Sequence, residues 1–144
     1  FLNYLRQEYS QVRYFGFDLS PDMIQAAKTR HALDLNAYFS VSSQLSNTAD
    51  YSIASGIFNV RLEYSDAEWF EYLKLSLDTL SQSSRKGFAF NALTSYSDYS
   101  KRRSYLYYLD PCVLFDLCKT RYSNNVSLLH DYGLYEFTII VRNS

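Results

Sequence analysis

The sequence predicts an α/β domain with a mostly parallel sheet that is closed by an antiparallel C-terminal hairpin. Strand-like apolar runs alternate with helical patterns along the chain, which is typical of a parallel sheet covered by helices on both faces. One predicted strand, residues 13–18, ends in a carboxylate directly before a helix start. Near the C-terminus, the short link Asp131-Tyr132-Gly133 allows only an antiparallel hairpin.

The composition fits one globular domain and excludes several classes of protein. The chain has 144 residues, of which 47% are hydrophobic and 20% are charged. Its net charge of −1 provides no field that attracts nucleic acid or an anionic membrane. No apolar run approaches the roughly 18 residues of a membrane span, and the start FLNYLRQEYSQVR lacks the pattern of a signal peptide. We therefore expect a single domain over residues 1–144, with no nucleic-acid or membrane partner.

The two cysteines, Cys112 and Cys118, both fall in one predicted helix. Six residues of helix separate them by about 9 Å along the axis, which is too far for a disulfide. We expect two reduced, buried thiols and a cytoplasmic protein. The spacing of the cysteines and histidines matches no zinc-ligand pattern, so no metal site is predicted.

The N-terminal part predicts a helix, a strand and a second helix. One face of a helix over residues 2–12 gathers the apolar side chains Leu2, Leu5, Tyr9 and Val12. The strand over residues 13–18 follows. Ser20 is a good N-cap for a helix over residues 21–31, with Pro21 and Asp22 suited to its first turn. Its last turn carries cations, where the helix dipole favours them: Lys28, Arg30 and His31.

The rest of the chain predicts further strands and two helices. Short apolar runs over residues 37–41 and 50–54 are predicted strands. A capping box, Ser65-Asp66-Ala67-Glu68, begins a helix whose apolar residues recur at helical spacing: Trp69, Leu73, Leu77 and Leu80. Later predicted elements are a strand over 86–91, an irregular segment rich in Tyr and Ser over 92–109, a helix from Asp110-Pro111 to about Tyr122, and strands over 125–131 and 134–142.

Asp18 is the most informative residue of this pattern. A carboxylate at the carboxyl end of a buried strand is where α/β folds hold the ribose hydroxyls of a nucleotide-type cofactor. Residues 14–31 therefore predict a cofactor-binding α/β domain. The other interpretation of Asp18 is a carboxylate that caps the following helix.

The chain resembles the class I S-adenosylmethionine-dependent methyltransferases over essentially all of its residues. The segments that carry the resemblance are GFDLSPDMIQAAK, ASGIFN, KGFAFNALTSYSD and HDYGLYEFTIIVR, which are similar to the family's second strand, fourth-strand loop, fifth strand and closing hairpin. The resemblance implies a Rossmann-like methyltransferase three-layer sandwich and S-adenosylmethionine as the cofactor. It also implies methyl transfer to an oxygen or nitrogen of a small-molecule or saccharide acceptor.

The resemblance implies a set of cofactor-binding residues. Asp18 would accept hydrogen bonds from the ribose hydroxyls, while Leu19 and Met23 would flank the adenine. The family often has an acidic residue after its third strand, where this chain has the polar run Ser42, Ser43 and Gln44. The whole implied set is Asp18, Leu19, Ser20, Met23, Ser42, Ser43, Gln44, Ser55 and Gly56.

The acceptor side is predicted to lie in the loops after the fourth and fifth family strands. In the first loop, Phe58 could stack on the substrate and Asn59 could hold an amine or a hydroxyl. The second loop combines two arginines with several phenols, which suits an anionic or sugar-phosphate substrate. The implied substrate-binding residues are Ile57, Phe58, Tyr96, Arg102, Arg103, Tyr105 and Tyr108. Catalytic candidates are Asn59 and His130, the latter as a base for a hydroxyl acceptor.

One departure from the family concerns its first strand and glycine-rich loop, which would precede Phe1. The opening helix resembles the one that follows this loop, so we expect a fragment that lacks the first strand of the sheet. The strands at 13–18 and 50–54 would then each have an unpaired edge. We expect such a fragment to bind the cofactor poorly, to be inactive alone, and to be able to form a homo-oligomer through the exposed sheet or the aromatic loop.

Two other functions remain as alternatives. One is a non-catalytic methyltransferase-like binding module. The other is a nicotinamide-dependent short-chain oxidoreductase, which requires a Tyr-x-x-x-Lys pair. None of the 15 tyrosines has a lysine four residues later, which argues against the oxidoreductase.

Overall fold

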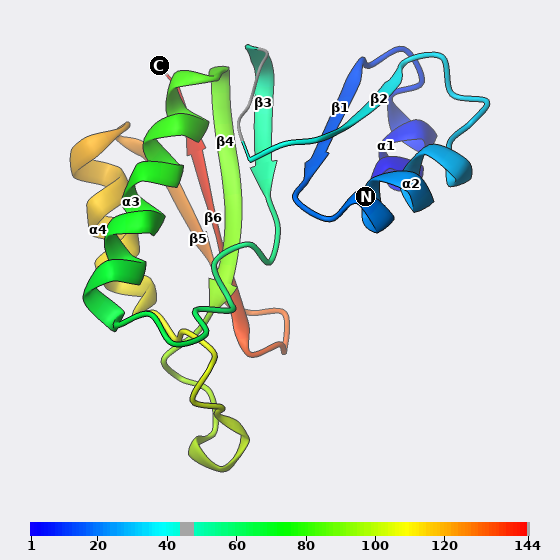
Figure 1. Cartoon of the computed structure of the whole chain (residues 1–144). Helices are drawn as coiled ribbons and strands as arrows, with labels where there is room; N and C mark the ends of the chain where they lie inside the picture. Colours follow the sequence, from blue (N-terminus) through cyan, green and yellow to red (C-terminus); the bar gives the residue numbers. More distant parts are fainter. Residues whose placement is uncertain (44–47, 144) are drawn as a thin grey trace. The chain divides into compact units, whose positions relative to one another are not determined.

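The computed structural model describes residues 1–43 and 48–143, which form two compact units, Phe1–Ser46 and Asn47–Ser144 (Figure 1). Each unit has its own sheet. The strands are ordered β1-β2 in the first unit and β3-β4-β6-β5 in the second. Among the described residues, β1 therefore pairs only with β2, and β3 only with β4. The expectation of a single domain stays a prediction.

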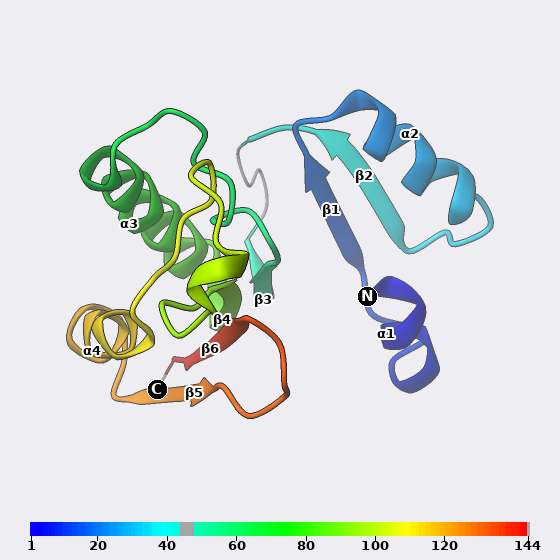
Figure 2. The same ribbon diagram turned by 90° about the horizontal axis from the view of Figure 1, so that it is seen from below.

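The first unit contains α1 (Leu2–Glu8), β1 (Tyr14–Asp18), α2 (Pro21–Arg30) and β2 (Ala37–Val41). The two strands are parallel, and their register runs from Tyr14 opposite Ala37 to Asp18 opposite Val41. Figure 2 shows α2 alongside this strand pair. The N-cap predicted for α2 is confirmed, because the Ser20 hydroxyl accepts a hydrogen bond from the Met23 backbone at 3.3 Å.

The first helix ends earlier than predicted. The backbone leaves the helical conformation at Tyr9, so Tyr9 and Val12 do not share the predicted apolar face and are exposed. The Arg6 guanidinium explains this end, because it donates to the backbone carbonyls of Tyr9 at 3.3 Å and Val12 at 2.7 Å. It also forms an ion pair with Asp34 at 2.6 Å, which joins α1 to the turn before β2.

The second unit contains a mixed four-stranded sheet with two helices on one of its faces (Figures 1 and 2). Its elements are β3 (Ala49–Ala54), α3 (Asp66–Gln82), β4 (Ser84–Leu93), the short 3₁₀ helix η1 (Tyr99–Lys101), α4 (Pro111–Arg121), β5 (Asn125–Leu129) and β6 (Glu136–Arg142). Strands β3 and β4 are parallel, whereas β6 is antiparallel to both β4 and β5. The predicted antiparallel C-terminal hairpin is therefore confirmed.

The core of this unit lies between the sheet and the two helices. Alternate residues of β4 and β6 are buried as cross-strand pairs: Phe88 with Val141, Phe90 with Ile139, and Ala92 with Phe137. Buried leucines from α3 and α4 complete it: Leu73, Leu77, Leu80 and Leu114. The capping box predicted for α3 is present, with Ser65 and Glu68 each bonded to the other's backbone N–H.

The prediction of two buried thiols is half right. Cys118 lies on the inner face of α4, and burial raises the pKa of its thiol to about 12. Cys112 is exposed, because it lies in the first turn of α4 on the side away from the core. Both cysteines are free thiols, as predicted. In the described ranges, no helix has the length and apolar character needed to cross a membrane.

A polar cluster joins α3 to the end of α4. The Arg121 guanidinium donates to both carboxylate oxygens of Asp78, at 2.8 and 2.5 Å, and the Tyr122 hydroxyl donates to the same carboxylate at 2.8 Å. These hydrogen bonds, with that from Arg121 the strongest, lower the pKa of Asp78. The cluster thus fixes the spacing of the two helices at one end.

We predict that Leu77→Ala lowers the free energy of unfolding by about 3 kcal/mol, because it removes buried methyl groups and leaves a cavity. Leu77 is 0% exposed, whereas Leu75 in the same helix is 66% exposed. The matched control Leu75→Ala should change the free energy by less than about 0.5 kcal/mol. Urea denaturation followed by circular dichroism measures both; equal losses in the two variants would contradict the described orientation of α3.

The Asp78 cluster predicts a dependence of stability on pH. The pKa of Asp78 is lower in the folded chain than the value of 3.8 expected when unfolded, so its ionised form stabilises the fold above that pH. This contribution is lost as the pH falls through the folded pKa. Asp78→Asn should therefore destabilise the chain at neutral pH, by at most about 1 kcal/mol since the cluster is partly solvated, and the difference should vanish in strong acid.

Thermal unfolding across this pH range measures the effect. The control is Asp116→Asn, because the Asp116 side chain is exposed and makes no hydrogen bond or ion pair with the described residues. The prediction would be contradicted if wild type and Asp78→Asn differed in thermal stability by the same amount at neutral pH and at strongly acid pH.

Candidate functional site

Asp18 lies at the carboxyl end of β1, with an exposed side chain, as the sequence predicts. Its Oδ1 accepts a hydrogen bond from the Ser20 backbone at 2.8 Å, which shapes the turn into α2. In the part of the chain that the structure describes, its Oδ2 has no donor. One carboxylate oxygen therefore serves the turn, as the capping interpretation proposed, and the other remains available for a ligand.

Two large apolar side chains follow this carboxylate closely in the chain, one in the turn and one in the first turn of α2. Leu19 is 69% exposed and Met23 is 60% exposed, although both are apolar. Exposed side chains of this size next to a free carboxylate oxygen suit a ligand that has both an apolar ring and hydroxyl groups. Ser20, which the resemblance also implied as a cofactor residue, uses its hydroxyl to cap α2.

The polar run after β2 is only partly described. Ser42 extends the pairing of β1 and β2, since its backbone N–H donates to the Asp18 carbonyl at 3.1 Å. Ser43 is exposed. Gln44 lies outside the described residues. The structure therefore places Ser42 and Ser43 at the same sheet edge as Asp18.

In the second unit, the loop after β3 is held by a side chain of the neighbouring strand. Asn91, in β4, accepts a hydrogen bond from the Gly56 backbone at 2.7 Å and donates one to the Glu136 carboxylate at 2.7 Å. The second bond fixes which amide atom faces Gly56. Gly56 has a φ of +73°, a conformation that residues with a Cβ rarely adopt. Ser55 and Ile57 on either side are exposed, as expected for ligand contacts.

The predicted substrate role of Phe58 is wrong. Its side chain is 0% exposed and packs edge-on against Phe90 in the core, with ring centroids 5.7 Å apart. Its carbonyl accepts a hydrogen bond from the Trp69 indole at 2.9 Å, which joins the loop to α3. Phe58 therefore anchors the loop and cannot stack on a substrate.

Asn59 also has a structural role that the sequence did not predict. Its Oδ1 accepts a hydrogen bond from the Leu93 backbone at 3.2 Å, and its carbonyl accepts one from Tyr107 at 2.9 Å. Its side-chain N–H₂ group has no acceptor among the described residues. Of the Asn59 side chain, only this N–H₂ group could form a hydrogen bond with a substrate, and it would be the donor.

The arginine- and tyrosine-rich loop after β4 is stabilised by its own side chains. Arg102 donates to the carbonyls of Ser95 and Ser97 and lies over the ring of Tyr108, at 5.2 Å from the centroid. The Tyr108 hydroxyl accepts a hydrogen bond from the Arg103 backbone at 3.0 Å. Arg102 and Tyr108 therefore hold the loop, whereas the Arg103 side chain is exposed.

Two further predicted residues, Tyr105 and Tyr96, are exposed. Tyr105 accepts backbone hydrogen bonds from Arg61 at 3.0 Å and Leu62 at 3.1 Å, so it pairs the two loops. The Tyr96 ring lies 5.8 Å from that of His130, which is exposed directly after β5. Because β5 and β4 run in the same direction, the structure brings these two residues to one edge of the sheet.

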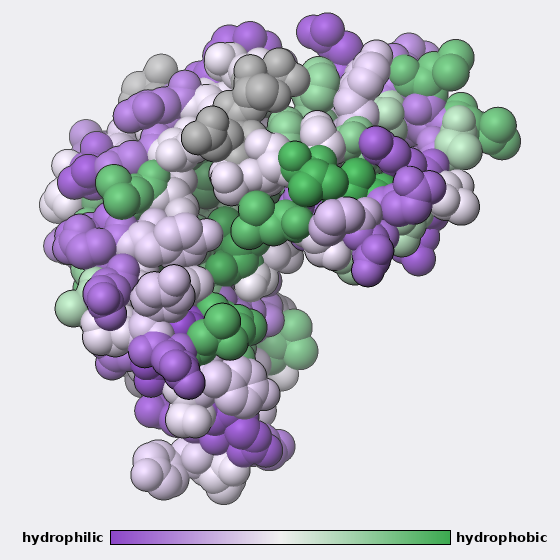
Figure 3. All heavy atoms as spheres, in the orientation of Figure 1, coloured by the Kyte–Doolittle hydropathy of each residue, from purple (hydrophilic) through white to green (hydrophobic). Residues whose placement is uncertain are grey.

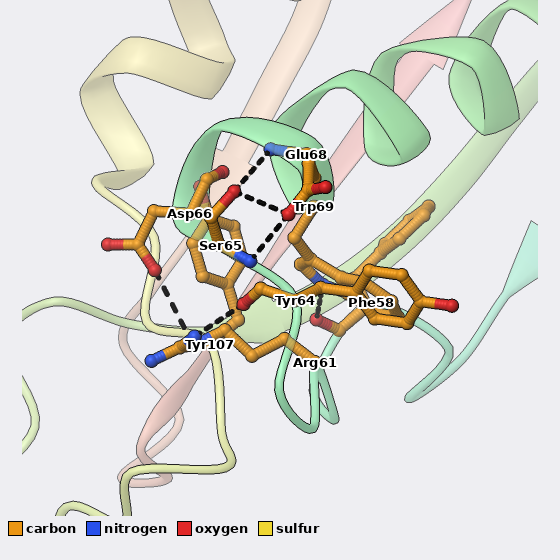
Figure 4. A network of polar contacts seen from close by, with 8 residues as sticks. All are labelled: Phe58, Arg61, Tyr64, Ser65, Asp66, Glu68, Trp69 and Tyr107. Carbon is orange, nitrogen blue, oxygen red and sulfur yellow. Dashed lines mark hydrogen bonds and ion pairs between the residues drawn. The ribbon is translucent and has the colours of Figure 1, made fainter.

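Arg61 is a functional candidate that sequence reasoning missed. It lies in the loop between β3 and α3, where it donates to the Tyr64 carbonyl at 2.6 Å and pairs with Asp66 at 3.4 Å (Figure 4). With Arg102, Arg103 and several tyrosines, it lines a cavity of about 450 Å³ between the two loops. Nothing in the local sequence around Arg61 marks it, because only the pairing of distant loops brings it there.

Another cavity, of about 510 Å³, lies beside β2 and is lined by His31, Asp34 and Tyr38 among others. Its lining includes β2 residues from Ala37 to Ser40 and none of the predicted site residues. In the described ranges, no group of three or more His, Cys, Asp or Glu side chains could hold a metal ion.

The chain is similar to known proteins in both sequence and fold. It is 55% identical over 143 residues to "Putative methyltransferase Rv1506c" of Mycobacterium tuberculosis (strain ATCC 25618 / H37Rv), a match that covers 99% of this chain and 86% of that protein. No family model matches the chain.

The fold is similar to that of magnesium protoporphyrin IX methyltransferase (ChlM) from Synechocystis PCC 6803. The crystal structure with bound SAH matches with a TM-score of 0.65 and 13% identity, over 90% of this chain and 64% of that one. The structure with bound SAM matches with a TM-score of 0.60 and 14% identity, over 90% of this chain and 59% of that one. This chain thus spans less than two thirds of the length of that enzyme.

The identity to the mycobacterial protein extends over nearly all of this chain, and it accompanies the α/β fold, the closing hairpin and a carboxylate at the end of β1. The fold is that of a methyltransferase whose crystal structures hold SAH or SAM, and the chain belongs to the same family as the mycobacterial putative methyltransferase.

Proposed function

We propose that this chain binds S-adenosylmethionine through the turn after β1 and serves methyl transfer to an oxygen or nitrogen of a small-molecule or saccharide acceptor. The observation that carries the proposal is Asp18, an exposed carboxylate at the end of a parallel strand, one of whose oxygens has no donor among the described residues. The ChlM structures that share the fold contain SAH or SAM.

The residues of the turn suit this cofactor. The free carboxylate oxygen of Asp18 can accept from the ribose hydroxyls, and charge-assisted hydrogen bonds of this kind are strong. Leu19 and Met23 offer exposed apolar surface for the adenine. When bound, S-adenosylmethionine supplies the reactive methyl group on its sulfonium, so the protein mainly aligns the acceptor and excludes water.

On the acceptor side, the proposed roles fall to residues at the carboxyl edge of the second sheet. His130 is exposed and is our candidate to take a proton from a hydroxyl acceptor. The Asn59 side-chain N–H₂ group is the candidate to orient that acceptor. Neither Phe58 nor Arg102 takes part directly, because the first is buried and the second is bonded to backbone carbonyls.

The alternative is a non-catalytic methyltransferase-like binding module. One observation favours it: Phe58 and the Asn59 side-chain oxygen, two groups predicted to meet substrate, support the loop instead. Such a module would bind the cofactor without forming S-adenosylhomocysteine in the presence of any acceptor.

We predict that Asp18→Asn weakens the binding of S-adenosylmethionine by about tenfold or more, as measured by isothermal titration calorimetry. The asparagine keeps an oxygen for the Ser20 N–H, so the turn should persist, but it removes the charge and the free acceptor. The control is Asp22→Asn, which changes a neighbouring exposed carboxylate in the first turn of α2.

The control variant should bind as the wild type does. Equal affinity of wild type and Asp18→Asn, or no binding of S-adenosylmethionine by the wild type, would contradict the proposed site.

A further inference from the structure

The cavity between the two loops of the second unit combines cationic and aromatic side chains. The loops follow β3 and β4, whose carboxyl ends lie at one edge of the sheet because the two strands are parallel. The chain carries a net charge of −1, yet three guanidinium groups and one carboxylate line this cavity of about 450 Å³. Figure 3 shows hydrophilic and near-neutral residues over the foot of this unit, where the second loop lies.

The cavity is formed by the protein itself, because hydrogen bonds pair the two loops. Val60 and Leu106 form an antiparallel bridge. On one side of it, the Arg61 N–H donates to the Tyr105 carbonyl at 3.0 Å, and on the other side the Tyr107 N–H donates to the Asn59 carbonyl at 2.9 Å. The Tyr107 hydroxyl donates to the Asp66 carbonyl at 3.3 Å, which joins the loop to α3 (Figure 4). Contacts within the protein therefore fix the positions of the two loops around the cavity.

The three arginines differ in how many of their N–H donors remain free. Arg102 uses Nε and Nη2 for two loop carbonyls and lies over the ring of Tyr108, so only its Nη1 has no partner among the described residues. Arg61 uses Nη1 for the Tyr64 carbonyl and Nε for Asp66, and its Nη2 has no partner among the described residues. Among the residues that the structure describes, Arg103 uses Nη1 alone, for the Arg102 carbonyl at 3.0 Å, which leaves most of its donors without a partner there.

The chemistry of the free donors indicates what they would bind. A guanidinium presents N–H groups in a planar fork that matches the paired oxygens of a phosphate or a carboxylate. Tyr99, which also lines the cavity and is 90% exposed, adds an aromatic face beside these donors. Asp66, whose side chain is 76% exposed, is the one acidic group in the lining, and its partner Arg61 lies beside it.

We infer that this cavity holds an anionic group, phosphate or carboxylate, of the methyl acceptor, through Arg61 and Arg103. The inference rests on the proposed function, because it names the chemistry of the acceptor. It assigns Arg102 mainly a positioning role, because two loop carbonyls and the Tyr108 ring together hold its guanidinium, and leaves the binding to the other two arginines.

The test measures the affinity of the whole chain for three sugars that share one ring: a glucose monophosphate, glucuronate and glucose. NMR titration at low ionic strength is suitable, since salt screens exposed charges. We expect the two anionic sugars to bind and glucose not to bind. Arg61→Gln and Arg103→Gln should each weaken this binding by about tenfold. The anionic sugar that binds more tightly shows whether the cavity prefers a phosphate or a carboxylate.

The control is Arg85→Gln, which removes an exposed arginine near the other end of β4. It should leave the binding unchanged. The inference would be overturned if all three sugars bound equally or if neither anionic sugar bound. It would also be overturned if neither cavity variant lost affinity for the anionic sugars, or if Arg85→Gln lost as much affinity as they did. Arg103→Gln should not disturb folding, because the Arg103 side chain is exposed and, in the described ranges, bonds the carbonyl of the adjacent residue alone.

Titration of the same samples with S-adenosylmethionine separates this inference from the proposed function. A chain that binds S-adenosylmethionine but no anionic sugar contradicts the inference alone. A chain that binds anionic sugars but no S-adenosylmethionine contradicts the methyltransferase proposal, and the acceptor role of the cavity is then lost with it.

Discussion

Parallel pairing of strands is the constraint on which the candidate site depends. In a parallel pair both carboxyl ends lie at one edge, so the loops that follow them start side by side. The pairing of β1 with β2 places Asp18 next to the residues that follow Val41. The pairing of β3 with β4 does the same for the loops that begin at Ser55 and Thr94. Strand pairing therefore brings the polar loop residues of each unit to one sheet edge.

In the second unit, side chains then hold these loops in defined conformations. Asn91 and Asn59 each use an amide oxygen to bind a backbone N–H of the other strand or its loop, at Gly56 and Leu93. Arg102 does the equivalent for the segment after β4, through loop carbonyls. Buried or half-buried polar groups need such partners, and supplying them fixes the loop geometry. The cost is that some residues of suitable chemistry are no longer free for a ligand.

The sequence predicted what depends on local pattern and missed what depends on distant contacts. The capping box at Ser65, the closing hairpin and the position of Asp18 at the end of a strand follow from neighbouring residues, and all are confirmed. The burial of Phe58 could not be predicted, because it depends on Phe90 more than thirty positions away. Likewise, Arg61 joins the candidate cavity only through the pairing of two loops, which no local signal encodes.

The most direct test of the account is to locate where the chain binds S-adenosylhomocysteine. In ¹H–¹⁵N NMR spectra, we predict that this ligand shifts the backbone signals of Leu19 and Ser20, at the turn beside the Asp18 carboxylate. The signals of His31 and Tyr38, which line the separate cavity beside β2, should stay unchanged. Shifts confined to that cavity, or no shift at the Asp18 turn, would contradict the assignment of the cofactor site.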